Sequence, residues 1–202
     1  MKAFLPLLAA TAIAPCALAQ GADDSGWYAG IGYEFLQEKD GPQEYQAIGL
    51  TGGYNINRYF GAELTAAFGV EGEDTFQPET SFDNGAGGTN TIPSIATSAE
   101  LSHRIDLMGV GRLPVTDRIS LVGKAGVSHY QYDYSFRVGA TDTAPGGGYS
   151  TSPKGYGFSA GVGAEMALTD RISLSGGYDF HAEQGVFDGD VEGFQIGVKR
   201  RF

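Results

Sequence analysis

Cysteine and long hydrophobic runs are the scarcest features of this sequence, and each shortage excludes a class of fold. The one cysteine, Cys16, lies in the N-terminal segment, which excludes a disulfide framework for the rest of the chain. No later segment approaches the roughly 20 consecutive apolar residues of a membrane-spanning helix. Helical periodicity is missing as well, and 32 glycines disfavour long helices. A chain of this kind can cross a membrane only with strands.

Basic residues are also scarce. The sequence has 13 Lys and Arg against 24 Asp and Glu, and its formal net charge is −11. A charge of this sign argues against nucleic acid as a partner, because such binding depends on neutralising phosphates with Lys and Arg.

Residues 1–19 have the composition of a cleaved secretory signal peptide. Lys2 provides the positive start, residues 4–13 are mainly apolar, and residues 17–19 form an A-x-A cleavage site. Pro15 stands where a lipoprotein signal has a small residue before its cysteine, which disfavours lipidation of Cys16. We therefore predict an exported protein whose residues 20–202 form one domain.

Residues 191–202 show the clearest strand pattern. Phe194, Ile196 and Val198 lie on one parity, and Gln195 and Gly197 lie on the other, so the two faces meet different solvents. A strand that ends the sequence must pair with an earlier element, and in a barrel that element is the first strand.

Earlier segments repeat this alternation. They are residues 27–35, 47–54, 59–68, 101–113, 119–134, 156–168 and 172–181. Eight strands of about ten residues have the length that a tilted strand needs to cross a bilayer. Residues 71–99 and 136–154 break the alternation, and we predict long loops there. The predicted fold is all-β, an eight-stranded antiparallel up-and-down transmembrane β-barrel.

One short turn occurs twice. Residues 116–121 and residues 169–174 share the sequence Thr-Asp-Arg-Ile-Ser-Leu, and short turns alternate with longer connections along the chain. In outer-membrane barrels the short turns face the periplasm and the long loops face outward. We therefore expect both termini on the periplasmic side and the long loops outside the cell.

The apolar parity is predicted to face lipid and the small or charged parity to face the lumen. A soluble, lipocalin-like barrel would reverse this, but an eight-stranded barrel has room only for side chains, and the small parity suits that space. Aromatic residues also gather near the strand ends, as in the interfacial girdles of membrane barrels. These residues are Trp27, Tyr54 and Phe60 at one end and Phe35, Phe68, Tyr156 and Phe180 at the other.

The lumen-facing parity contains five acidic and five basic residues. They are Glu34, Glu63, Arg104, Asp106, Arg112, Lys124, Glu165, Asp179, Lys199 and Arg201. Buried charges are tolerated when they are paired, and we expect Glu63 and Arg112 to form one such pair. The set is interpreted as a structural ion network that fills the barrel, with a gate or narrow polar pore as the alternative.

The surplus negative charge lies in the outer connections. Loss of Lys2 with the signal would leave 12 basic against 24 acidic residues, a charge of −12. Residues 37–44 carry −2, residues 71–100 carry −6, residues 133–154 carry 0 and residues 183–192 carry −4, which accounts for the whole excess. Such a rim is either solvated or holds divalent cations that bridge it to lipopolysaccharide.

Catalytic and metal-binding patterns are absent from the sequence. His103 and His129 are predicted to point outward and His181 inward, so the three histidines share no face for a metal. Ser128 and His129 are adjacent and therefore face opposite sides, which makes them a poor nucleophile and base. We predict no catalytic residue, no cofactor and no metal site.

The chain resembles the small outer-membrane β-barrel superfamily of porin-like, OmpA-type, OmpX-type and opacity proteins. The motifs that carry the resemblance are Trp-Tyr-x-Gly-x-Gly-Tyr at residues 27–33, the repeated turn, Gly-Val-Gly-Ala-Glu at residues 161–165 and the terminal Phe202. The resemblance implies that Phe202 and its strand are the signal for the barrel assembly machinery, and that periplasmic chaperones carry the unfolded chain. No peptidoglycan-binding domain follows residue 202 in the sequence, so a wall-anchoring role is not expected.

The family hosts several roles, so the resemblance leaves the function open. The leading hypothesis is a non-enzymatic, integral outer-membrane protein of Gram-negative bacteria that contributes to envelope structure, or to surface interaction through its acidic loops. A narrow passive pore for small solutes is the alternative, and a lipid-modifying enzyme is a third hypothesis. Outer-membrane lipid and lipopolysaccharide are the expected partners, with an extracellular or host partner for the loops.

Overall fold

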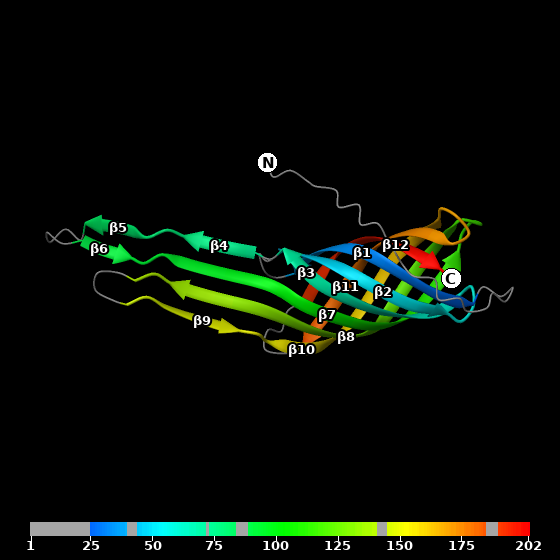
Figure 1. Cartoon of the computed structure of the whole chain (residues 1–202), viewed down its shortest axis with the longest axis horizontal. Coiled ribbons are helices and arrows are strands. Elements are labelled where there is room, and N and C mark those ends of the chain that lie inside the picture. The colour runs from blue at the N-terminus through cyan, green and yellow to red at the C-terminus, as the bar shows by residue number, and fades with distance from the viewer. Residues whose placement is uncertain (1–24, 40–43, 72, 84–88, 141–144, 185–189) are drawn as a thin grey trace.

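A computed structural model describes residues 25–39, 44–71, 73–83, 89–140, 145–184 and 190–202. The predicted signal peptide, residues 1–19, lies outside these ranges. The predicted eight-stranded barrel is confirmed (Figure 1). Its wall is formed by β1 (Gly26–Glu38), β2 (Glu44–Asn55), β3 (Phe60–Glu71), β7 (Ile95–Pro114), β8 (Ile119–Val138), β10 (Lys154–Ala167), β11 (Ile172–Gln184) and β12 (Asp190–Arg201).

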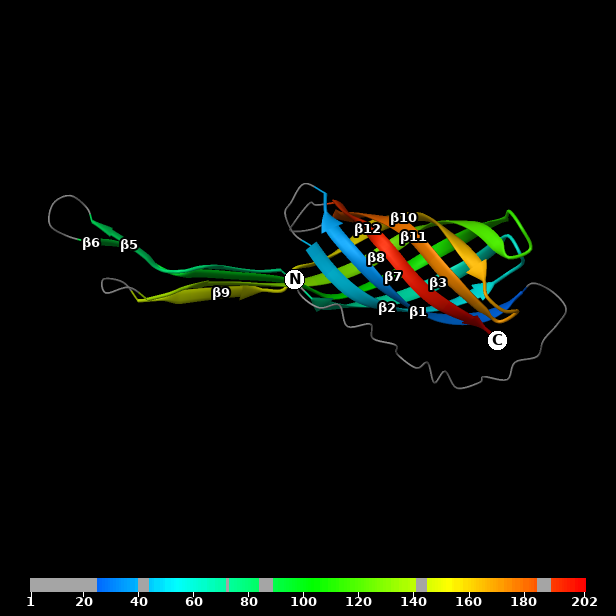
Figure 2. The ribbon, with the colours of Figure 1, turned by 90° about the horizontal axis from the view of Figure 1, so that it is seen from above.

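Every neighbouring pair of wall strands is antiparallel, and the barrel closes between β1 and β12. Their register runs from Tyr28 opposite Arg201 to Glu38 opposite Val191. The last backbone bond of this seam joins the amide of Phe202 to the carbonyl of Trp27 over 3.0 Å. Figure 2 shows the tilted strands of the closed wall, with β12 beside β11.

The outer face of the wall is apolar, as the alternation predicted. Leu107 and Val127 are 57% and 59% exposed, and Val162 and Phe194 are 69% and 66% exposed. Within the described residues no helix has the length and apolarity needed to cross a bilayer. Exposed apolar surface of this extent fits a lipid environment, since a soluble protein would bury it.

The short turns are built in the same way. Thr116 Oγ1 accepts hydrogen bonds from the amides of Arg118 and Ile119 over 3.2 and 3.0 Å. In the second copy of the sequence, Thr169 Oγ1 accepts the corresponding bonds from the amides of Arg171 and Ile172 at the same two distances. The side chains of the turn residues thus replace ladder bonds that the bend removes, which explains why the six-residue sequence recurs.

The predicted long loops are wrong in large part, because strands occupy much of them. Strands β7 and β8 each run for 20 residues and continue past the barrel rim (Figure 1). There β4 (Glu73–Gln77) pairs with β7, β9 (Gly147–Thr151) pairs with β8, and β5 (Thr80–Asp83) pairs antiparallel with β6 (Thr89–Ile92). We call this projection, residues 73–83, 89–99, 134–140 and 145–151, the β arm. It lies at the opposite end of the molecule from the C-terminus (Figures 1 and 2).

A register shift in β7 corrects a second prediction. The ladder with β8 skips Ser102 between Leu101 and His103. By the alternation of residues 101–113, Leu101 belongs to the apolar parity that was predicted to face lipid, but its side chain is only 1% exposed inside the barrel. A bulge adds one residue to one strand and so reverses the parity beyond it. Just before Ser102 the odd-numbered residues of β7 therefore face the interior, and after Ser102 the even-numbered residues do.

Candidate functional site

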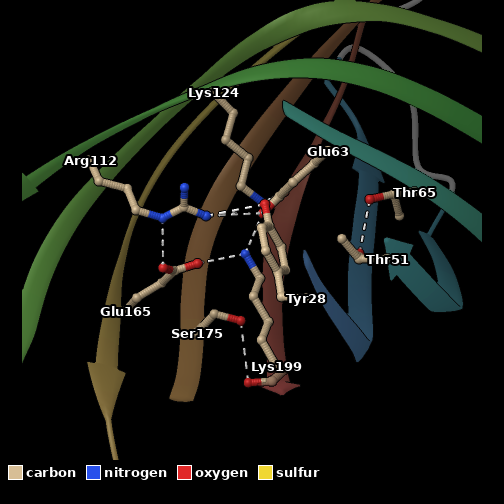
Figure 3. Close-up of polar contacts among 10 residues, drawn as sticks. Tyr28, Thr51, Glu63, Thr65, Arg112, Lys124, Glu165, Ser175 and Lys199 are labelled. Carbon is tan, nitrogen blue, oxygen red and sulfur yellow. Dashed lines mark hydrogen bonds and ion pairs between the residues drawn. The ribbon is translucent and has the colours of Figure 1, made fainter. Parts of the chain in front are cut away.

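Half of the ten predicted lumen charges come together inside the barrel, and Glu63 lies at their centre (Figure 3). Its carboxylate accepts a hydrogen bond from Lys199 Nζ at 2.5 Å, and Lys124 Nζ lies 3.1 Å from its other oxygen. The expected pair with Arg112 is present at the longer distance of 3.7 Å. Three strands other than that of Glu63 thus supply cations to a carboxylate that is 2% exposed.

Glu165 extends this cluster towards the short turns. It accepts a hydrogen bond from Arg112 Nε at 3.0 Å and another from Lys199 Nζ at 2.6 Å. Two carboxylates therefore share three cations, and each cation reaches a carboxylate within hydrogen-bond or ion-pair distance. We call Glu63, Arg112, Lys124, Glu165 and Lys199 the Glu63 cluster. Pairing of this density offsets the cost of removing the charges from water.

Tyr28 completes the Glu63 cluster, and the sequence did not single it out. Its hydroxyl donates to Glu63 at 2.8 Å and accepts from Arg112 at 3.2 Å. Its ring packs directly on Gly53, the opposite residue of β2, where any side chain would collide with the ring. The Gly-rich inner parity therefore makes room for the long side chains that cross the lumen.

A second polar group lies farther from the short turns. Arg104 donates to Glu34 at 2.6 Å and to Asp106 at 2.9 Å, and all three side chains are buried. A row of hydrogen bonds continues from Asp106 through Ser128 and Ser159 to Nδ1 of His181, with 2.6 Å for the last bond. This row links β7, β8, β10 and β11 around the inner wall. We call Glu34, Arg104, Asp106, Ser128, Ser159 and His181 the Arg104 cluster.

Ser159 and His181 resemble a nucleophile and base pair, which sequence reasoning missed because the two residues are on different strands. The side chains come together because Ser159 faces His181 across the β10 and β11 ladder. Ser159 is fully buried and His181 is 2% exposed, so a substrate has no path to the hydroxyl. The pair is part of the packed wall, and geometry alone does not make it catalytic.

The third layer of the interior is apolar and rich in tyrosine. It lies towards the β arm and was not expected from the sequence. Tyr45 and Tyr132 are 3% and 5% exposed, and their ring centroids are 5.3 Å apart. The layer consists of Leu36, Tyr45, Ala47, Ala67, Ala99, Leu101, Tyr130, Tyr132 and Val191, with Tyr134 packed against it. We call it the tyrosine layer, and it fills the lumen above the two charged clusters.

Two of the ten predicted interior charges make no ion pair within the described residues. Asp179 is buried and lies over Gly161, and Arg201 is exposed at the mouth near the short turns. The acidic outer connections lie partly outside the described residues, because residues 40–43, 72, 84–88 and 185–189 are not among them. Their predicted role as a cation-holding rim stays a prediction.

The histidines lie on the predicted faces, and the two outer ones also make ring contacts. His103 and His129 lie on the outer face, and their rings stack at 5.7 Å between centroids. His129 also meets the ring of Tyr156 at 4.8 Å. In the described part of the chain no group of three or more His, Cys, Asp or Glu side chains could hold a metal.

Comparison with known proteins agrees with this architecture. The family model of the outer membrane protein beta-barrel domain matches residues 3–202. No curated protein sequence matches the chain.

Several solved structures share the fold. A major outer membrane protein from Thermus thermophilus has a TM-score of 0.53 at 13% identity, over 88% of this chain and 99% of that one. Ail, the attachment invasion locus protein of Yersinia pestis, solved in complex with the heparin analogue sucrose octasulfate, has a TM-score of 0.50 at 14% identity, over 88% and 97%. Neisserial surface protein A has a TM-score of 0.50 at 13% identity, over 91% and 100%.

Proposed function

Because this chain belongs to the outer membrane protein beta-barrel domain family, we propose that it is a non-enzymatic outer-membrane protein that contacts the cell exterior through its β arm. The observation that carries the proposal is the arm itself. Strands β7 and β8 leave the wall together and are widened by β4 and β9 into a four-stranded sheet. The barrel is the anchor, and the arm is the part that meets a partner.

The side chains of the arm support a contact surface. Phe76 is 68% exposed and Tyr149 is 67% exposed, while Phe136 is 42% exposed. Serine and threonine surround them, and Ser98 and Ser135 are hydrogen-bonded across the two central strands at 2.7 Å. Exposed aromatic side chains that are carried on a paired sheet are typical of protein-binding surfaces. We therefore favour an extracellular protein as the partner of the arm.

The alternative of a narrow pore is less well supported. A solute would have to pass the Glu63 cluster, the Arg104 cluster and the tyrosine layer in turn. Leu101 of the tyrosine layer and His181 of the Arg104 cluster are among the largest fully buried side chains of the barrel. We propose that the interior is closed and that it stabilises the barrel.

The short-turn pattern of outer-membrane barrels supports a proposed orientation. With the short turns in the periplasm, both termini are periplasmic and the arm is extracellular. We propose in addition that Phe202 and β12 serve as the signal for the barrel assembly machinery, after periplasmic chaperones have delivered the chain. The lipid-facing wall contacts outer-membrane lipid and lipopolysaccharide.

An arm-less variant tests the surface proposal. Residues 75–97 and 136–149 are each replaced by Asn-Gly, which joins the cross-strand partners Asp74 with Ser98 and Ser135 with Ser150 by two-residue hairpin turns. Bacteria that display the full chain should attach to surfaces coated with extracellular-matrix protein, and attachment should be lost with the arm-less variant. Equal attachment by a correctly folded arm-less barrel would contradict the proposal.

Conductance in a planar lipid bilayer tests the closed interior. The refolded full chain should give no discrete current steps. Steps that change when Lys124 and Arg112 are neutralised would support the pore in place of the closed barrel.

A further inference from the structure

The mouth of the barrel at the short-turn end is a basic vestibule. Its cavity has a volume of about 870 Å³ and is open to solvent. Six of the residues that line it are Lys or Arg and three are Asp or Glu, although the whole chain has nearly twice as many acidic as basic residues. The closed-barrel proposal makes no use of this cavity.

The cations of the vestibule fall into two sets. Arg112 and Lys199 form the floor and are engaged by Glu63 and Glu165. The rim consists of Arg58, Arg118, Arg171 and Arg201. All four rim side chains are exposed, and within the described residues none of them forms an ion pair.

The repeated turn places rim cations on separate strand pairs. Arg118 lies in the turn between β7 and β8, and Arg171 lies in the turn between β10 and β11. The backbone amide of each donates to the threonine hydroxyl of its turn. Asp117 and Asp170 are the acidic residues of the rim, so its four guanidinium groups exceed its carboxylates by two. A concave site walled by a low-dielectric barrel concentrates that positive potential at its centre.

The floor contains an unsatisfied donor and an unsatisfied acceptor. Nη1 of Arg112 has no hydrogen-bond partner, although the side chain is 9% exposed, and Oδ1 of Asn55 also lacks one. Both residues line the vestibule, and both atoms flank the same inward-facing glycine, Gly61. An unpaired buried donor costs free energy, which an oxyanion oxygen could recover at Nη1 of Arg112, whereas Oδ1 of Asn55 is itself an acceptor and would need a donor group of the ligand.

We propose that this vestibule binds a small oxyanion, a phosphate or carboxylate compound with at least two negative charges. Arginine matches such groups, because its planar guanidinium donates two parallel hydrogen bonds to one oxyanion. One charged group of the ligand meets the rim arginines, and the second reaches towards Arg112 at the floor. This inference does not depend on the β arm, which lies at the other end of the molecule.

Titration with inorganic pyrophosphate tests the proposal, using the full chain refolded in an uncharged detergent and isothermal calorimetry as the readout. The double variant Arg118→Gln with Arg171→Gln should bind about tenfold or more weakly, because two charge-assisted contacts are removed. The matched control, Arg137→Gln with Lys154→Gln, removes the same net charge outside the vestibule and should bind within about twofold of the parent. All three proteins must show the same folded electrophoretic mobility.

The outcomes are distinct. Absence of saturable binding to the parent chain overturns the site, and equal weakening in both double variants reduces it to an effect of net charge. Repeating the titration in bilayer nanodiscs with and without anionic phosphatidylglycerol identifies the source of the oxyanion. Loss of pyrophosphate binding only with anionic lipid would show that a lipid headgroup takes the same site, and unchanged binding would identify a soluble ligand.

Discussion

The two ends of the barrel interior are filled by different chemistry. Towards the short turns, the Glu63 cluster holds charged side chains that reach across the lumen to one another. Towards the β arm, the tyrosine layer fills the same width with rings and aliphatic groups. The charged end depends on complete pairing, so the loss of one partner leaves others uncompensated. The apolar end depends on volume, so its losses should follow the size of the group removed.

Glu63→Ala should be the most damaging single change. The change leaves Lys124 without its carboxylate partner and removes one of the two carboxylate partners of Lys199 and of Arg112. It should destabilise the fold by about 3–5 kcal/mol. Urea unfolding in lipid vesicles, followed by the fluorescence of the single tryptophan, measures the effect. Glu79→Ala, at an exposed position of the arm, is the control and should change stability by less than about 0.5 kcal/mol. Equal effects of the two changes would remove the structural role of the Glu63 cluster.

Leu101→Ala tests the other end of the interior. Its side chain is 1% exposed, and its truncation should cost about 2–4 kcal/mol by the same assay. Ile92→Ala in the arm, where the side chain is 51% exposed, should cost less than about 0.5 kcal/mol. A negligible effect at Leu101 would mean that the bulge does not turn this residue into the tyrosine layer.

Gly53→Ala should have an intermediate effect, because a methyl group there collides with the ring of Tyr28 and shifts its hydroxyl from Glu63. Overpacking of this kind costs about 1–3 kcal/mol. The neighbouring Gly52→Ala is the matched control, since a side chain at Gly52 meets no atom within 4 Å. If both variants unfold at the same urea concentration, the packing of Tyr28 on Gly53 does not contribute to stability.

The arm-less variant should show the smallest effect on the barrel. The arm residues Phe76, Phe136 and Tyr149 are exposed, so their removal uncovers little of the core. The free energy of unfolding should change by less than about 1 kcal/mol. A larger loss would show that the arm and the interior fold as one cooperative unit.

The sequence predicts the wall well and the interior only in part. Strict alternation places Glu63 and Arg112 on the inner face of neighbouring strands, and the structure brings them within 3.7 Å. Alternation cannot place Leu101, because the bulge at Ser102 depends on pairing with β8, which no local pattern reveals. The clustering of Tyr45 with Tyr132 is hidden for the same reason, since their contact joins distant strands.

The strands of the β arm were missed because of composition. Residues 73–99 contain threonine, serine and proline in a mixture that is also typical of loops. The strand structure of β4 and β9 comes from pairing with the extended ends of β7 and β8, and β5 and β6 pair with each other, so it is set by pairing and not by local composition. The rim of the vestibule was missed for another reason. The repeated turn is visible in the sequence, but the arginines of separate turns come together only when the barrel closes.

The seam between β1 and β12 has a consequence for how the protein folds. The bond from Phe202 to Trp27 joins positions about 175 residues apart, and the pairs beside it are nearly as distant. Loop closure over such a separation carries an entropic cost before any contact rewards it. The wall strands can pair in hairpins early, but until the seam forms both terminal strands present open edges to other chains. Closure of the seam therefore ends the period in which the chain is exposed to aggregation, and catalysis of that one step would protect the whole barrel.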